Sequence, residues 1–302
     1  MIDIIIPVYN AGKTLARTLN SVLEQVNSSD FCVYIVDDCS TDNYSYILRH
    51  FSKYLNITFL KTKKNGGPGP ARNLALENSK NEYIVFLDSD DEFYRNDSVL
   101  TMLKAIDDYD MVFGQMYQVI NGEDIYCHHE GCLHGKMYRR SFLEDKKIKF
   151  HSIRIKGGNA HEDNAFNQLY ISCTNKVNYI DDVTYKYNDV ESSITGSENR
   201  HKSFKCYIKS MDWLFKEIEK QKHIEKDYVG IVITCVMFYC YFNYLLEEKE
   251  YSYCFEKLSF LKEMYKKYSK YIDYSDMLRI YKNFDYPVVP NITIYEFIDK
   301  IK

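Results

Sequence analysis

Three carboxylates stand within four residues at Asp88, Asp90 and Asp91, directly after a short apolar run. Carboxylates this close repel one another unless a positive charge is present, and hard divalent cations prefer such oxygen ligands. Mg²⁺ typically takes one or two protein carboxylates and leaves its other positions to substrate phosphates. The Asp88-Ser89-Asp90 spacing therefore predicts a divalent-metal site. A polar turn with a helix N-cap is the alternative, since Asp is also a favoured cap.

A second acidic pair, Asp37-Asp38, follows another apolar run. A carboxylate at this position can accept a hydrogen bond from the N–H of a nucleobase such as uracil. The residues Ser40 to Asp42 can cap the helix that follows. A reading in which this stretch supplies only caps and turns stays open.

The segment from Asn65 to Asn73 is rich in glycine and proline and ends at a helix start. Glycine permits the backbone to approach a ligand closely. Arg72 would then present a fixed fork of donors to a nucleotide or a diphosphate. The alternative is an ordinary loop with a surface arginine.

Another acidic pair, Glu162-Asp163, follows His161 at the expected start of a helix. A carboxylate there can act as a general base that removes a proton from a nucleophile. The alternative is a structural one, because acidic residues at a helix N-terminus interact favourably with the helix dipole.

The tract from Cys127 to Cys132, with His134 shortly after it, contains several possible zinc ligands. Its spacing matches no standard zinc pairing, and no second Cys/His pair follows at finger spacing. A structural zinc is therefore not expected.

Apolar runs alternate with helical patterns over the first ninety residues, and the acidic residues stand where the runs end. This order predicts β-α-β units, and hence an α/β fold with a mostly parallel sheet covered by helices on both faces. Ligands of such sheets bind outside the carboxyl ends of the strands. The expected strands are Ile2 to Val8, Phe31 to Val36, Ile57 to Leu60 and Tyr83 to Leu87, with helices over Leu15 to Val26, over Ile47 to Leu55 and from about Ala71.

The later part of the chain is expected to become helical, first over Asn164 to Ile171. Helical patterns then cover Phe204 to Ile218, Tyr228 to Leu246 and Cys254 to Tyr268. The stretch Tyr228 to Leu246 carries no charge and approaches the ~20 residues that span a bilayer. Its tyrosines and its acidic flanks favour a helix in a core or an interface over a transmembrane span.

The composition fits a globular protein: of 302 residues, 45% are hydrophobic and 27% charged. The net charge of −4 gives no reason to expect a nucleic-acid partner. Nine cysteines are scattered, and no secretory signal is visible at the start. These features lead us to expect free thiols in a reducing, cytoplasmic setting. A peripheral contact with the membrane and a homo-oligomer are left open.

Together, in order and spacing, these motifs resemble the inverting glycosyltransferases of family 2, which have the GT-A fold. The resemblance covers about residues 1–200 and implies a catalytic domain there, with residues 201–302 as a helical region. That region is expected to bind acceptor, pair subunits or touch a membrane surface. The matching stretches are Ile5 to Asn10, Val36 to Asp42, Asn65 to Asn73, Phe86 to Asp91, Gly135 to Arg140, His161 to Asp163 and Tyr185 to Thr195.

The resemblance also implies roles for single residues. Asp90 would coordinate Mn²⁺ or Mg²⁺, and Asp88 would contact ribose, the metal or a metal-bound water. Asp163 would be the catalytic base, with Glu162 beside it. The remaining donor-site residues would be Pro7, Tyr9 and Asp38 around the base and ribose, Arg72 beside the nucleotide, Ser89 between the two metal-site carboxylates, and Lys136 near the diphosphate.

The expected function is transfer of a sugar from a nucleotide-sugar donor, with UDP favoured, to a hydroxyl of a glycan or glycolipid. Synthesis of a cell-surface polysaccharide is the expected setting. A non-catalytic sugar-nucleotide binder is one alternative. A sugar nucleotidyltransferase is another, although the Gly-rich loop it needs after the first strand is poorly matched by Tyr9 to Lys13.

Overall fold

The computed structural model describes residues 1–120, 122–128, 131–154, 161–188, 200–225, 229 and 266–267. The helices expected over 228–246 and 254–268, and the end of the segment 185–195, lie almost entirely outside these residues. Within them, no helix combines the length and the apolar character needed to cross a lipid bilayer.

The first half of the chain builds β-α-β units, as predicted. β1 is the central strand of this half, parallel to β2 on one side and to β4 on the other. β3 then pairs in parallel with β2. The elements are β1 (Ile2–Val8), α1 (Leu15–Leu23), β2 (Phe31–Asp37), α2 (Ser45–Phe51), β3 (Asn56–Lys61), α3 (Pro68–Asn78) and β4 (Tyr83–Phe86).

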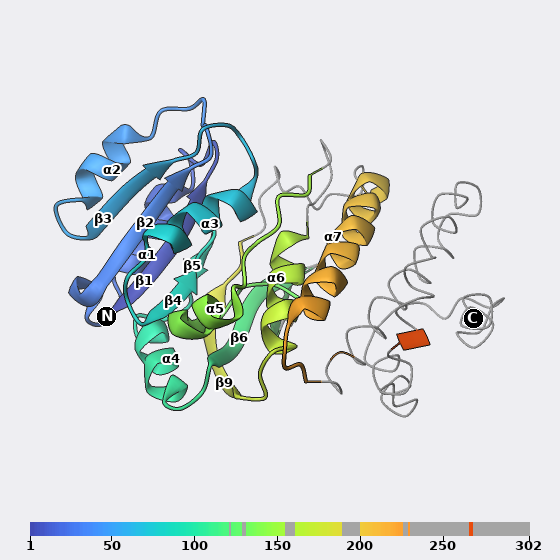
Figure 1. The fold of residues 1–302 in the computed structure, drawn as a ribbon. Helices are drawn as coiled ribbons and strands as arrows, with labels where there is room; N and C mark the ends of the chain where they lie inside the picture. Colours follow the sequence, from blue (N-terminus) through green and yellow to red (C-terminus); the bar gives the residue numbers. More distant parts are fainter. Residues whose placement is uncertain are drawn as a thin grey trace.

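The second half extends the sheet in the order β3-β2-β1-β4-β8-β6-β9-β5, with β7 paired to β6 (Figure 1). β8 runs antiparallel to both β4 and β6, whereas β6 and β9 are parallel. The mixed α/β sheet is therefore parallel at its N-terminal side and mixed beyond β4. The elements are β5 (Glu92–Phe93), α4 (Ser98–Ile106), β6 (Met111–Ile120), β7 (Glu123–Cys127), β8 (Lys136–Arg139), α5 (Arg140–Lys146), α6 (Glu162–Ile171), β9 (Val177–Lys186) and α7 (Arg200–Lys220).

Both faces of the sheet are covered, because strand side chains alternate between two apolar cores. In β1, Ile4 and Ile6 pack with α1, α2 and α4, while Ile5 packs with α3, α5, α6 and α7. All three isoleucines are fully buried. A strand apolar on both faces must lie inside such a three-layer arrangement, which explains the continuous apolar run in the sequence.

α7 packs beside α6 (Figure 1), and the domain boundary expected at residue 200 stays a prediction. Met211 and Leu214 of α7 are fully buried in the same core as Phe166 and Tyr170 of α6. Within the described residues, α7 is thus part of the same packed unit as the strands that carry the acidic motifs.

Candidate active site

The acidic residues predicted to share one edge of the sheet do so. In the parallel register, Val8 of β1 lies opposite Asp37 of β2, and Ile5 lies opposite Phe86 of β4. Asp38 and Asp88 follow these strands at their carboxyl ends. This is the edge at which open α/β sheets bind ligands.

Asp38 is buried and already accepts several hydrogen bonds from the protein. Its Oδ1 accepts from the Gly66 N–H at 3.0 Å and from the Thr62 hydroxyl at 2.8 Å, and its Oδ2 accepts from the Gly67 N–H at 2.6 Å. In this structure Asp38 therefore fastens the glycine-rich loop to the end of β2. Its expected contact with a nucleobase stays a prediction.

Pro7 and Tyr9 flank the end of β1 beside Asp38. Pro7 is buried within the strand, whereas Tyr9 is 50% exposed. The Asp38 N–H donates to the Val8 carbonyl at 2.8 Å, which joins the two strand ends. The expected nucleobase pocket thus has its residues gathered at one place.

Asp91 is fixed as an acceptor at the turn after β4. Its N–H donates to the Asp88 carbonyl at 3.1 Å, and its side chain is almost fully buried. The Tyr185 hydroxyl donates to Asp91 Oδ2 at 2.6 Å, and the Asn188 N–H donates to Oδ1 at 2.8 Å. β9 thereby holds the acidic turn in place.

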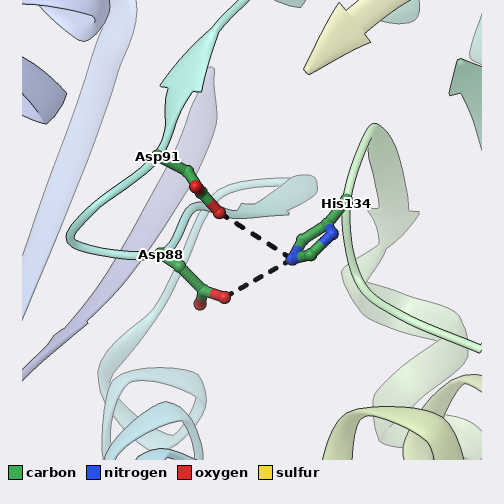
Figure 2. A group of neighbouring side chains, drawn as sticks. All are labelled: Asp88, Asp91 and His134. Atoms are coloured by element: carbon green, nitrogen blue, oxygen red, sulfur yellow. Dashed lines mark ion pairs between the residues drawn. The ribbon is translucent and has the colours of Figure 1, made fainter. Parts of the chain in front are cut away.

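His134 lies between Asp88 and Asp91, as Figure 2 shows. Its Nε2 is 3.5 Å from Asp88 Oδ2 and 3.9 Å from Asp91 Oδ2, and its ring stacks on Tyr185 with centroids 4.5 Å apart. Burial opposes a charged imidazole, but Cys132 and Asp88 raise the pKa of His134 well above its ordinary value. His134 is thus an electrostatic partner of Asp88, and the ligand atoms of Asp88, Asp91 and His134 all lie within 4.8 Å of one another, close enough to hold a metal ion together.

His134 was not expected at this site, because in the sequence it stands beside the possible zinc tract. His134 arrives here because the strand that follows it, β8, pairs antiparallel with β4. The order of the motifs in the sequence does not predict the pairing of β8 with β4.

The surroundings of the Asp90 carboxyl group disfavour its negative charge. Its backbone carbonyl accepts from Arg17 Nη2 at 2.6 Å and from Asn188 Nδ2 at 3.1 Å. Burial and the Asp88 charge raise the pKa of its carboxyl to about 6. Carboxylate oxygens are the donors that Mn²⁺ and Mg²⁺ prefer, and a bound divalent cation would favour the ionised form of Asp90; its expected role as a metal ligand stays a prediction.

Arg72 connects the acidic turn with the second acidic pair. Its guanidinium is almost fully buried, and its Nη2 donates to Asp88 Oδ1 at 2.6 Å while its Nη1 donates to Glu162 Oε1 at 2.8 Å. Burial alone would raise the pKa of Asp88, but Arg72 and His134 lower it below its ordinary range. Arg72 thus joins two protein carboxylates, and its expected place beside a nucleotide stays a prediction.

Asp163 has the electrostatic character expected of a general base. It stands in the first turn of α6, and its Oδ1 accepts from the Asn164 N–H at 2.8 Å. Burial, and then the neighbouring Glu162 charge, raise the pKa of Asp163 to about 7. A base whose pKa lies near the working pH is ionised in a large fraction of the molecules and still binds a proton well.

Gly69 marks where α3 meets α6. A Cβ at this position would lie 2.8 Å from the His151 carbonyl oxygen and 2.9 Å from Glu162 Cγ. A real Cβ essentially never lies this close to an atom to which it is not bonded, so any other residue here would require the His151 backbone and the Glu162 side chain to shift. The close backbone approach predicted for this loop thus occurs at Gly69, where the backbone approaches His151 and Glu162 of the same protein.

Lys136 and Ser89 complete the predicted donor-site residues. Ser89 is half-buried between the two carboxylates of the motif. Lys136 is fully buried in β8, where its ammonium donates to the Cys132 carbonyl at 2.5 Å and lies 3.7 Å from the centre of the Phe113 ring. Its ammonium thus contacts groups of the protein, and its expected contact with a diphosphate stays a prediction.

Of the residues considered for zinc, His134 is the one that the structure brings to a possible metal site among the described residues. Among the described residues, the side chains that could jointly hold a metal are Asp88, Asp91 and His134. His128 Nε2 instead contacts the Ile180 carbonyl at 2.9 Å. His129 and Glu130 lie outside the described residues.

Comparison with known proteins identifies the family. The family model described as Glycosyl transferase family 2 matches residues 3–166, more than half of the chain. Those residues include both acidic turns, Arg72 and the Glu162-Asp163 pair.

Curated relatives extend the similarity. A glycosyltransferase of Rickettsia felis described as uncharacterized is 38% identical over 45% of this chain and 23% of its own length. The poly(ribitol-phosphate) beta-N-acetylglucosaminyltransferase TarS of Staphylococcus aureus is 27% identical over 70% of this chain and 38% of its own length. Glycosyltransferase GlyG of Streptococcus pneumoniae is 26% identical over 66% of this chain and 74% of its own length. The chain thus spans well under half the length of the first two.

Solved structures show the same fold. S. aureus TarS 1-349 in complex with UDP-GlcNAc has a TM-score of 0.70 at 22% identity, covering 87% of this chain and 81% of that one. The Pyrobaculum calidifontis mannosyltransferase PcManGT in complex with GDP-Man and Mn²⁺ has a TM-score of 0.54 at 16% identity, covering 74% of this chain and 65% of that one. With its GT-A fold and the match over residues 3–166, this chain belongs to glycosyl transferase family 2.

Proposed function

We propose that this protein is an inverting, divalent-metal-dependent glycosyltransferase that moves a hexosyl or N-acetylhexosaminyl group from a UDP-sugar to a hydroxyl group. The observation that carries the proposal is the buried Arg72 guanidinium, which joins Asp88 to Glu162 beside Asp163. Arg72 thus links the acidic turn that would hold the leaving group to the helix that carries the candidate base.

UDP is the proposed nucleotide because the S. aureus structure with TM-score 0.70 is a complex with UDP-GlcNAc. The acceptor is proposed to be a glycan or glycolipid of the cell surface. The printed name of TarS, which specifies poly(ribitol-phosphate), supports that setting.

Asp88 and Asp90 are the residues that would hold the cation. A bound divalent ion supplies positive charge that offsets the charge developing on the leaving diphosphate. Arg72 keeps Asp88 ionised and oriented for that task, since it lowers the pKa of the Asp88 carboxyl. The acidic turn is further fixed by the bond from Tyr185 to Asp91.

Asp163 is assigned the proton transfer. A sugar hydroxyl is a weak nucleophile at neutral pH, and a carboxylate within hydrogen-bond reach that removes its proton typically contributes ~10²–10⁴-fold. Attack from the Asp163 side, opposite the leaving group, gives inversion. A non-catalytic binder would have no use for such a base, and a nucleotidyltransferase is disfavoured by the family match.

A thermal-shift series tests the donor and the metal together. UDP-GlcNAc, UDP-glucose and GDP-mannose are each added with and without Mn²⁺. A ligand at 100 times its Kd stabilises a protein by about 2.7 kcal/mol. We expect a UDP-sugar to raise Tm most, and only fully with Mn²⁺.

The matched variants are Asp90→Asn and Asp108→Asn, the latter at an exposed position. Asp90→Asn should lose the Mn²⁺-dependent part of the shift, and Asp108→Asn should keep it. If no UDP-sugar raises Tm in the presence of Mn²⁺, the proposed donor is wrong.

A further inference from the structure

The residue that precedes the proposed base has an unfavourable backbone conformation. His161, the N-cap of α6, has φ 54° and ψ 28°, in the left-handed region, and its side chain makes no capping hydrogen bond. This conformation is strained for a non-glycine residue, so surrounding contacts must hold it. Because Glu162 and Asp163 follow directly, whatever fixes His161 also fixes them.

The contact that holds His161 comes from α7. The Ser210 hydroxyl donates to the His161 carbonyl at 3.0 Å, and this carbonyl also accepts the first helical bond, from the Ala165 N–H at 3.2 Å. Ser210 is fully buried, so water cannot replace this hydrogen bond. The bond therefore links α7 to the first turn of α6 at the residue before the acidic pair.

His151 fixes the direction of that hydroxyl. Its Nε2 contacts Ser210 Oγ closely, and its Nδ1 accepts from the Ile153 N–H at 3.1 Å. A hydroxyl has one proton. Since Ser210 uses it on His161, the Nε2 of His151 must be the donor. The ring is therefore the neutral tautomer with its proton on Nε2, in agreement with burial, which lowers the pKa of His151 to about 4.

Aromatic contacts on both sides of Ser210 keep the two histidines against α7. The His151 ring meets Trp213 edge-on with centroids 5.2 Å apart, and the His161 ring meets Tyr207 in the same way at 5.2 Å. Tyr207, Ser210 and Trp213 are spaced by three residues and so share one side of the helix. The contacts with both histidines therefore come from one side of α7.

We infer that Ser210, oriented by His151, is a positioning residue for the proposed base Asp163. α7 lies beyond residues 3–166, which the family model matches, so this role assigns a part of the catalytic machinery to the helix that follows the family segment. The inference rests on the proposed function only in naming Asp163 as the base. The link between Ser210 and the start of α6 stands on geometry alone.

Hydrogen exchange tests the link without any ligand. Ser210→Ala removes the bond to His161, and amides in the first turn of α6 should exchange about 3- to 10-fold faster, the range expected for one lost hydrogen bond. Ser172→Ala is the matched control, because Ser172 is equally buried and donates to Gln168 at the other end of α6 at 2.7 Å. It should leave the first turn unchanged. Equal exchange there in Ser210→Ala and wild type would overturn the inference.

Kinetics test the route through Asp163. The assay is UDP release from UDP-GlcNAc with Mn²⁺ and water as acceptor. Ser210→Ala should lower kcat about 10- to 100-fold with the donor KM within about 2-fold, since small misplacement of a reacting group is costly. Ser210→Thr, which keeps the hydroxyl, should recover most of kcat, and Ser172→Ala should stay near wild type.

The double variant separates the two claims. If Ser210 acts through Asp163, adding Ser210→Ala to Asp163→Asn should cause no further loss. Independent, multiplicative losses would contradict the positioning role and leave the base assignment intact. Near-normal turnover in Asp163→Asn alone would instead remove the proposed base, and the exchange result would still decide whether Ser210 holds α6.

Discussion

Arg72 and Glu162 form a buried ion pair, with 2.8 Å between Nη1 and Oε1, across 90 residues of sequence. The other terminal nitrogen of Arg72 bonds Asp88, so one guanidinium sets the spacing between the proposed leaving-group site and the base helix. A planar fork with fixed donors can do this, whereas a single ammonium cannot bridge two carboxylates in the same geometry.

Arg72→Lys should therefore lower both stability and turnover. Lysine keeps the positive charge but cannot bond both carboxylates in this geometry, so the loss of stability should be a part of the about 3–5 kcal/mol that removal of a buried ionic partner costs. Thermal unfolding and UDP release measure the two effects. Arg95→Lys is the control, because Arg95 also bonds two carboxylates, Asp97 and Asp182, but is 42% exposed. A Tm change in Arg72→Lys no larger than in Arg95→Lys would contradict the bridging role.

Tyr185→Phe should loosen the acidic turn. The variant removes the hydroxyl that donates to Asp91 and leaves that buried carboxylate with one partner fewer, at a cost of about 1–3 kcal/mol. Tyr170→Phe is the matched control, since it removes a buried hydroxyl that donates to the Asp110 carbonyl at 2.6 Å. Both variants should lose stability, but only Tyr185→Phe should weaken the Tm shift that Mn²⁺ produces. Equal Mn²⁺ responses would count against the role given to Asp91.

The pH dependence of turnover should follow Asp163. Its raised pKa, about 7, means that the ionised base is scarce below that pH and predominates above it. We expect kcat for UDP release to rise with pH between about 6 and 8 and then level off. A flat profile over that range would show that no group with this pKa limits the reaction.

The raised pKa of Asp163 also makes the stability of the protein depend on pH. A carboxyl whose folded-state pKa is raised favours the folded state most at low pH, and this contribution is lost as pH rises from its ordinary value of 3.8 through about 7. The Asn side chain does not titrate in this range. The Tm of Asp163→Asn minus the Tm of wild type should therefore increase as the pH rises from 5 to 8. A difference that stays constant over this range would contradict the pKa assignment.

The sequence allowed the N-terminal half of the fold and the place of the site to be predicted. Continuous apolar runs such as Ile2–Val8 are typical of buried parallel strands, and strand order then brings Asp38 and Asp88 to one edge. The helix expected from about Ala71 begins at Pro68, because proline suits the first turn of a helix. These elements depend on local patterns, which a single sequence contains.

The partners of the site residues could not be predicted in the same way. Arg72 was expected beside a nucleotide, but its two carboxylate partners come from segments 16 and 90 residues away. His134 enters through an antiparallel pairing, and Ser210 through the packing of α7 on α6. Each depends on long-range packing that neither periodicity nor motif spacing encodes.

The base assignment of Asp163 is tested most directly by single-turnover kinetics of Asp163→Asn with UDP-GlcNAc and Mn²⁺, beside Asp212→Asn on the exposed side of α7 as control. We predict that Asp163→Asn keeps the Mn²⁺-dependent Tm shift with the donor but loses about 10²-fold or more in the rate of UDP release. Asp212→Asn should match wild type. A normal rate in Asp163→Asn, with donor binding intact, would contradict the account.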